Sequence, residues 1–112
     1  MRAARPRQAS VRRELARLLA EAYIMEGVAD LVASGQWDPY TLPLSKLREA
    51  ARRLGLNLEG LLDRAQAMGL VTVRREWINI GRGSVGEEDR IFVGLLDPAL
   101  KEEVRAALKR FL

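Results

Sequence analysis

Residues 45–69 read SKLREAARRLGLNLEGLLDRAQAMG, and they divide into two amphipathic segments on either side of Gly55-Leu56-Asn57. Apolar residues recur in both segments at the three- and four-residue spacing of a helix face. Ser45 is suited to cap the first helix and Asn57 the second, while Gly55 and Gly69 are suited to end them. The side chains expected to face the core are those of Leu47, Ala50, Ala51, Leu54, Leu58, Leu61, Leu62, Ala65 and Met68. The stretch therefore predicts two helices joined by a turn of about three residues, which is a helix-turn-helix pattern.

A long helix is expected before this pair. Apolar residues recur from Val11 to Val32 at alternating steps of four and three, which is a helical stripe. Ser10 is a candidate N-cap, Ser34-Gly35 is a candidate end, and Gly27 is a position where the helix could kink. A seven-residue repeat of this kind suits packing against another helix, from the same chain or from a second copy.

A β-hairpin and a final helix are expected after the pair. Apolar and polar residues alternate over residues 71–74, and Ile91, Val93 and Leu95 share one face of a second strand. Between the strands we expect a bulge near residues 75–77 and a polar, Gly-rich loop over residues 81–89. Asp97-Pro98 predicts an N-cap followed by proline at the first helical position. The inward residues of that helix are predicted to be Leu100, Val104, Ala107, Leu108 and Phe111.

The expected fold is α+β and mostly helical. Its predicted order is a long N-terminal helix, a short extended piece at residues 41–44, two helices, a β-hairpin and a C-terminal helix. A chain of 112 residues with 48% apolar side chains is long enough for one domain with a real core. No apolar run approaches the roughly 18 residues of a membrane span, and no secretory signal is recognisable, so a cytoplasmic protein without a membrane partner is expected.

The residue types exclude several kinds of chemistry. The chain has no Cys and no His, so disulfides, thiolate nucleophiles, the usual general base and the commonest metal ligand are absent. The acidic run Glu87-Glu88-Asp89 has no further acids clearly converging on it, which disfavours a metal site. Ser45 and Lys46 are adjacent in sequence and ill-placed for a serine–lysine relay. We therefore expect no catalytic residues, no cofactor and no metal.

The net charge of +4 is unevenly distributed. Residues 1–13 carry five Arg and no acid, and residues 46–75 carry seven basic against three acidic residues. A compositional bias of the source genome would explain the preference for Arg over Lys, but it does not explain this segregation. The pattern favours an anion-binding surface, and residues 1–9 are predicted to form a flexible basic arm.

Three segments resemble winged helix-turn-helix proteins of the MarR-like kind, or small archaeal or bacterial winged-helix regulators. They are Leu44-Ser45-Lys46-Leu47, Ala67-Met68-Gly69-Leu70-Val71 and residues 89–98, DRIFVGLLDP. The resemblance covers about residues 41–98. It implies a single winged-helix domain over residues 10–112. Its parts are a helix-turn-helix at 45–69, a wing at 70–96 and a C-terminal helix at 97–112.

The resemblance also implies a function, namely binding of double-stranded DNA by a transcriptional regulator or chromatin-type protein. The protein would form a homodimer through its N- and C-terminal helices. Within that arrangement, Ser45 and Lys46 would contact phosphate, Asn57 would begin the recognition helix and Arg64 would face the major groove. The wing would add Arg74 and Arg75 at its first strand and Arg82 and Ser84 at its tip.

One departure from this pattern favours an alternative. The exposed face predicted for the second helix of the pair carries Glu59, Asp63, Arg64 and Gln66, a net charge of −1, and the wing adds the acidic run at 87–89. Carboxylates can accept hydrogen bonds from cytosine, but they repel phosphates. The alternative is a winged helix that binds protein within a nucleic-acid-handling complex.

Three other sequence features each allow two interpretations. The glycine pattern of residues 81–86 matches a dinucleotide-binding motif in letters, but a second strand follows it where that motif needs a helix, so a wing loop is favoured. Arg48, Arg52 and Arg53 form either a phosphate-contacting row or a solvated face with a Glu49–Arg53 pair. Trp37 and Trp77 either stack on bases or anchor the core, and the core is the commoner role.

Overall fold

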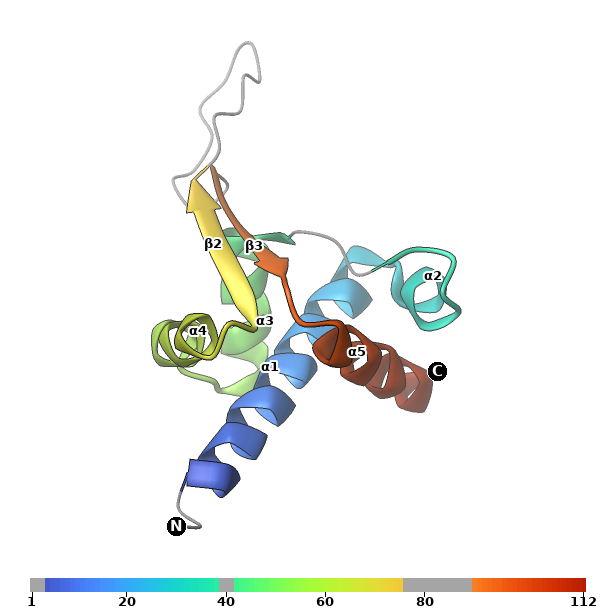
Figure 1. The fold of residues 1–112 in the computed structure, drawn as a ribbon. Helices are drawn as coiled ribbons and strands as arrows, with labels where there is room; N and C mark the ends of the chain where they lie inside the picture. Colours follow the sequence, from blue (N-terminus) through green and yellow to red (C-terminus); the bar gives the residue numbers. More distant parts are fainter. Residues whose placement is uncertain (1–3, 39–41, 76–89) are drawn as a thin grey trace, which may run out of the picture.

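The computed structural model describes residues 4–38, 42–75 and 90–112, with side chains from Ser10 onward (Figure 1). Its elements are α1 (Ala4–Glu26), α2 (Ala29–Ala33), β1 (Leu42–Pro43), α3 (Leu44–Leu54), α4 (Leu58–Ala67), β2 (Val71–Arg75), β3 (Ile91–Leu95) and α5 (Pro98–Phe111). A small antiparallel sheet lies at one side of the helices (Figure 1), so the mostly helical α+β class is confirmed.

Helix α1 begins six residues before the predicted N-cap. It starts at Ala4, so the prediction of a flexible arm through residue 9 is wrong for residues 4–9. Pro6 is tolerated there because the first N–H groups of a helix have no intrahelical partner. Ser10 is not a cap; its hydroxyl donates a hydrogen bond to Glu14, 3.3 Å away, within the helix.

Helix α1 also ends earlier than the apolar stripe predicts. Gly27 adopts a left-handed φ of +78°. Gly27 N donates to Ile24 O at 3.0 Å and Val28 N to Tyr23 O at 3.1 Å, the paired bonds of a Schellman motif. The chain then resumes as the short helix α2. Gly27 thus divides the predicted long helix in two, because glycine adopts this backbone conformation at no steric cost.

The apolar stripe of α1 is covered by the same chain. Val11, Leu15, Leu18 and Ala22 are at most 4% exposed, and α1 packs against α3, α4 and α5. Figure 1 shows α1 passing between α4 and α5. The homodimer is predicted from this stripe, but the stripe needs no second copy to bury it.

The sheet joins the helix pair to the hairpin strands. Its strand order is β1-β3-β2, with β3 antiparallel to both neighbours. Leu42 of β1 and Val73 of β2 both lie opposite the fully buried Val93. The N-cap of α3 is Pro43 and not Ser45, because the chain passes from β1 directly into the helix. Ser45 therefore lies in the first turn of α3.

Helix α5 closes the core. Asp97 caps it by accepting a hydrogen bond from Ala99 N at 3.1 Å, and Pro98 opens it, as predicted. Phe111 is 59% exposed, so its predicted inward position is wrong; it lies past Leu108, the last buried residue of the helix. Trp37 is 45% exposed in the turn after α2, so it is not a core anchor.

Candidate nucleic-acid interface

Helices α3 and α4 meet across a three-residue turn that follows from two local signals. Gly55 has φ +70°, and Leu56 N donates to Ala51 O at 2.9 Å, which ends α3. Asn57 then caps α4, because its Oδ1 accepts a hydrogen bond from Gly60 N at 3.3 Å. The predicted three-residue turn and the Asn57 cap are confirmed.

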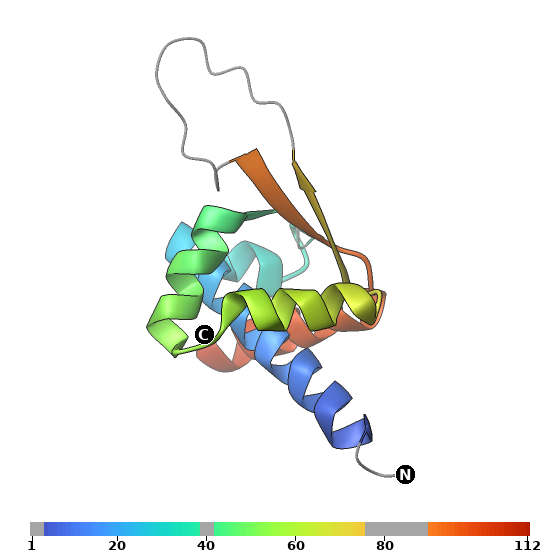
Figure 2. The same cartoon turned by 90° about the vertical axis from the view of Figure 1, so that its left-hand side faces the viewer.

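The outer face of α4 is polar and open to solvent. In Figure 2, α4 lies in front of α1 and α5, with no other described helix or strand over its outer side. Glu59, Asp63, Arg64 and Gln66 are all exposed, as predicted from the helical spacing. The opposite face is buried through Leu58, Leu61, Leu62 and Ala65.

Two of the predicted DNA-contacting residues, Asn57 at the cap of α4 and Arg64 in its last turn, both have side chains that reach Gly60. Arg64 folds back along the helix and donates from Nε to Gly60 O at 3.1 Å. A methyl group on Gly60 would lie 3.0 Å from Asn57 Nδ2 and 3.3 Å from Arg64 Nη2. Asn57 and Arg64 therefore approach each other over Gly60 because that residue has no side chain.

The acidic character of this face is partly neutralised from α3. Arg48 Nη2 lies 2.5 Å from Glu59 Oε2. The hydrogen bond from Arg48, together with a backbone hydrogen bond, holds the pKa of Glu59 below its ordinary value. Glu59, Asp63 and Arg64 sum to −1, and including Arg48 brings the local charge to zero. Among the described residues, Asp63 makes no ion pair.

One of the two predicted phosphate contacts at the start of α3, Lys46, pairs with α1. Lys46 Nζ lies 3.3 Å from Glu26 Oε2 at the carboxyl end of α1. Ser45 is partly buried in the same turn. Ser45 and Lys46 therefore lie at the amino end of α3, while Asn57 caps α4 and Arg64 lies in the last turn of α4.

The remaining arginines of α3 pair with acids on two helices. Arg52 contacts Glu49 at 3.0 Å within α3, and Arg53 contacts Glu21 of α1 at 3.2 Å. The expected Glu49–Arg53 pair is therefore wrong. Exposed ion pairs of this kind contribute roughly 0–1 kcal/mol, so a phosphate can replace the carboxylate at small cost.

Part of the predicted wing lies outside the described residues. Arg74 and Arg75 are exposed at the end of β2, opposite Phe92 and Ile91 of β3. The structure does not describe the predicted contacts Arg82 and Ser84, Trp77, the glycine pattern at 81–86, the acidic run at 87–89, or residues 76 and 77 of the predicted bulge.

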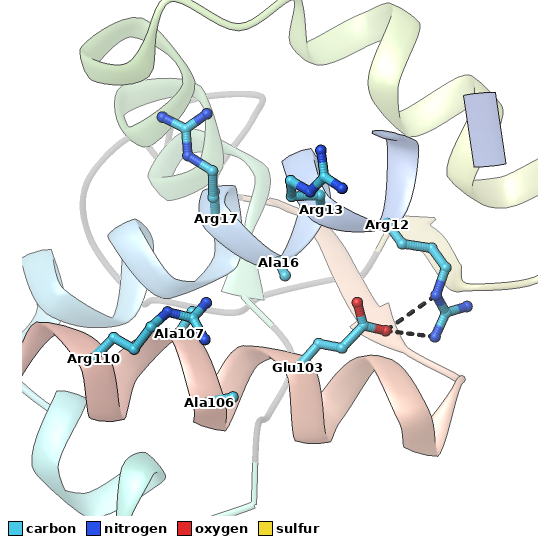
Figure 3. A pocket seen from close by; sticks show the side chains of 8 residues that line it. All are labelled: Arg12, Arg13, Ala16, Arg17, Glu103, Ala106, Ala107 and Arg110. Carbon is cyan, nitrogen blue, oxygen red and sulfur yellow. Dashed lines mark hydrogen bonds and ion pairs between the residues drawn. The ribbon is translucent and has the colours of Figure 1, made fainter. Parts of the chain in front are cut away.

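A second cationic feature, which the sequence reasoning missed, lies between α1 and α5. A hollow of about 450 Å³ opens there, and Figure 3 shows Arg13 and Arg17 along its α1 side and Arg110 reaching from α5. Its remaining apolar lining consists of Ala16, Ala106 and Ala107. The four-residue spacing of Arg13 and Arg17 is a signal for it, but Arg13 also belongs to the basic N-terminal block, which hides that spacing.

Arg12, at one end of this hollow, joins α1 to the start of α5. Its guanidinium contacts Asp97 Oδ2 at 2.7 Å and Glu103 Oε1 at 2.6 Å. The hydrogen bond from Arg12 lowers the pKa of Asp97, and the two carboxylates raise the pKa of Arg12. Arg12 is thus a structural cation whose charge is already balanced.

Over the described residues, the acidic side chains form no group of three that could hold a metal ion. In the same part of the chain, no helix has the length and apolar character needed to cross a membrane.

Comparison with known proteins gives no relative: no family model, no curated protein and no solved structure matches the chain.

Proposed function

We propose that this protein is a winged-helix protein that binds double-stranded DNA, with α4 as its recognition helix and the β2–β3 hairpin as its wing. Three features support the fold assignment: the order of the elements, the β1-β3-β2 sheet, and the helix pair placed between β1 and β2. The proposed role is binding, as a regulator or chromatin-type protein, and not catalysis.

The observation that carries the proposal is the polar face of α4 next to β2. Asn57 and Arg64 meet over Gly60 on that helix, and α4 packs against β2, which ends in Arg74 and Arg75. An amide and a guanidinium are the groups that read base edges, while cations on the neighbouring strand position the protein on phosphate. The Arg48–Glu59 contact reduces the repulsion expected from the acidic residues.

The dependence of duplex binding on salt tests the proposal. Binding of a random-sequence duplex is measured by fluorescence anisotropy between low and physiological salt. The logarithm of the affinity should fall linearly with the logarithm of the salt concentration, and Arg74→Ala with Arg75→Ala should reduce that slope by roughly 2. Lys109→Gln, an exposed change on α5, is the control and should leave the slope unchanged. Negligible duplex binding at low salt contradicts the proposal.

A second candidate function is binding of a protein partner through the same face. One observation that favours it is Asp63, which is exposed and makes no ion pair among the described residues. Another is that Lys46, Arg52 and Arg53 are already paired with carboxylates, which reduces the positive charge they offer to phosphate. A partner with basic side chains would complement Asp63. The salt titration separates the two functions, because a protein-binding module has no duplex affinity to lose.

The homodimer predicted through the terminal helices is not part of this proposal. The α1 stripe is buried within the chain, and a symmetric contact across the α1–α5 hollow would bring Arg13, Arg17 and Arg110 of two copies together. Like charges in contact destabilise an interface.

A further inference from the structure

The α1–α5 hollow gathers positive charge that the described chain does not balance. Arg13, Arg17 and Arg110 border it, and none of the three has a hydrogen bond or ion pair among the described residues. By contrast, Arg12, at the end of the same hollow, is held by two carboxylates.

The charge of the lining limits which ligand can neutralise it. Arg13, Arg17 and Arg110 contribute three positive charges, while the charge of Arg12 is already balanced by its two carboxylates. A carboxylate supplies one negative charge, and a phosphate monoester supplies about −1.5 to −2 at pH 7. Two adjoining phosphates therefore match the hollow better than a single phosphate or a carboxylate. Planar guanidinium groups also form paired hydrogen bonds with phosphate oxygens.

The size of the hollow is sufficient for a small ligand. Its volume of about 450 Å³ falls within the roughly 300–1,000 Å³ of small-molecule sites. Ala16, Ala106 and Ala107 leave the space between the two helices open where larger side chains would fill it. Arg13 and Arg17 are four residues apart, about 6 Å along the helix axis, so they can hold neighbouring phosphate groups.

We propose that the hollow between α1 and α5 binds a diphosphate group, carried by a small molecule, through Arg13, Arg17 and Arg110. The site goes beyond the proposed DNA binding and does not depend on it, because no residue of α4 or β2 lines it. Arg13, Arg17 and Arg110 are exposed, so a ligand can reach all three guanidinium groups from solvent.

Isothermal titration with inorganic pyrophosphate at constant ionic strength tests the proposal. Arg13→Gln with Arg17→Gln should weaken binding on the order of a hundredfold, about tenfold for each charge-assisted hydrogen bond removed. Lys109→Gln removes the same kind of charge from the residue next to Arg110 but does not line the hollow, so its affinity should equal that of the wild type. Arg110→Gln provides an independent variant on the other helix and should weaken binding about tenfold.

Thermal unfolding gives a second readout. Pyrophosphate should raise the melting temperature of the wild type. Without ligand, the double variant should melt close to the wild-type temperature, because Arg13 and Arg17 are exposed and make no hydrogen bond or ion pair among the described residues, and pyrophosphate should not raise its melting temperature.

Four comparisons identify the source of the anion and the results that would overturn the proposal. If a nucleoside diphosphate binds more tightly than pyrophosphate, the ligand is a nucleotide. If pyrophosphate binds more tightly, the ligand is the free anion. Citrate with equal affinity overturns the proposal, since the hollow would then respond to negative charge alone. Equal pyrophosphate affinity for wild type and double variant also overturns it, as does a duplex that displaces pyrophosphate and binds the double variant more weakly.

Discussion

Replacing Gly60 by Ala sets two effects of similar size against each other at the start of α4. Alanine in place of glycine stabilises a helix by roughly 0.5–1 kcal/mol. The new methyl group would lie 3.0 Å from Asn57 Nδ2, so the capping side chain must move. Loss of an N-cap hydrogen bond costs typically ~1 kcal/mol. We therefore expect the free energy of unfolding of Gly60→Ala to lie within about 0.5 kcal/mol of the wild-type value.

A double-mutant cycle with Asn57→Ala isolates the two effects. Once the cap is gone, Gly60→Ala has no Asn57 side chain to displace, so it should stabilise the protein by close to the full ~1 kcal/mol. Urea unfolding followed by circular dichroism gives the four free energies. The coupling between the two positions should be about 1 kcal/mol. Duplex affinity should fall in Gly60→Ala, because the methyl group also lies 3.3 Å from Arg64 Nη2.

Additive free energies in this cycle would show that the cap does not depend on the space above Gly60. Unchanged duplex affinity in Gly60→Ala would show that Asn57 and Arg64 do not act together on DNA.

The remaining predictions concern charge and assembly. Glu59→Gln with Asp63→Asn should raise non-specific duplex affinity at low salt by on the order of fivefold, because two exposed negative charges are removed from α4; an unchanged affinity would place α4 outside the groove. The hydrogen bond from Arg12 lowers the pKa of Asp97 in the folded protein. The ion pair therefore stabilises the fold at pH above the unfolded-state pKa of Asp97, about 3.9, and this stabilisation is lost as the pH falls through the folded-state pKa. Arg12→Ala should therefore lose less unfolding free energy on acidification than the wild type does. If both proteins lose the same amount, the Arg12–Asp97 pair does not contribute to acid sensitivity. Light scattering at tens of micromolar should give a monomer near 12.6 kDa, and twice that mass would contradict the like-charge argument.

The features predicted correctly from the sequence are those that neighbouring residues determine. Asn57 and Asp97 each accept a hydrogen bond from a backbone amide two or three residues away, so a short stretch of sequence is enough to predict each cap. Gly55 ends α3 because a left-handed residue is needed where the helix stops. The exposed face of α4 likewise follows from helical spacing alone.

Predictions from the sequence are wrong where distant parts of the chain decide the structure. The end of α1 is the exception, because a local feature decides it: the apolar steps continue past Gly27 without a break, and periodicity alone predicts one helix where the left-handed glycine makes two. Ser45 is a good cap by type, but pairing of Pro43 with Phe92 across the sheet starts α3 earlier. The Arg53–Glu21 pair joins residues 32 positions apart, which spacing within one helix does not predict.

The same limit explains why the hollow is not predicted from the sequence. Arg17 and Arg110 come together only because α1 and α5 pack side by side, and that packing is a property of the tertiary structure. The exposure of Phe111 has a related cause, since the helical stripe of α5 continues beyond the end of the surface that covers it.

The joint between β1 and α3 has a mechanical consequence. Pro43 is the last residue of β1 and the cap of α3, with no loop residue between them, and it is paired with Phe92 of β3. Proline fixes φ at this joint, which removes one of the two backbone torsions about which the joint could bend. We therefore expect a twist of β3 to tilt the first turn of α3. Helix α4 follows α3 across a three-residue turn and packs against α1 and β2, so its angle is set by those contacts and not by the Pro43 joint.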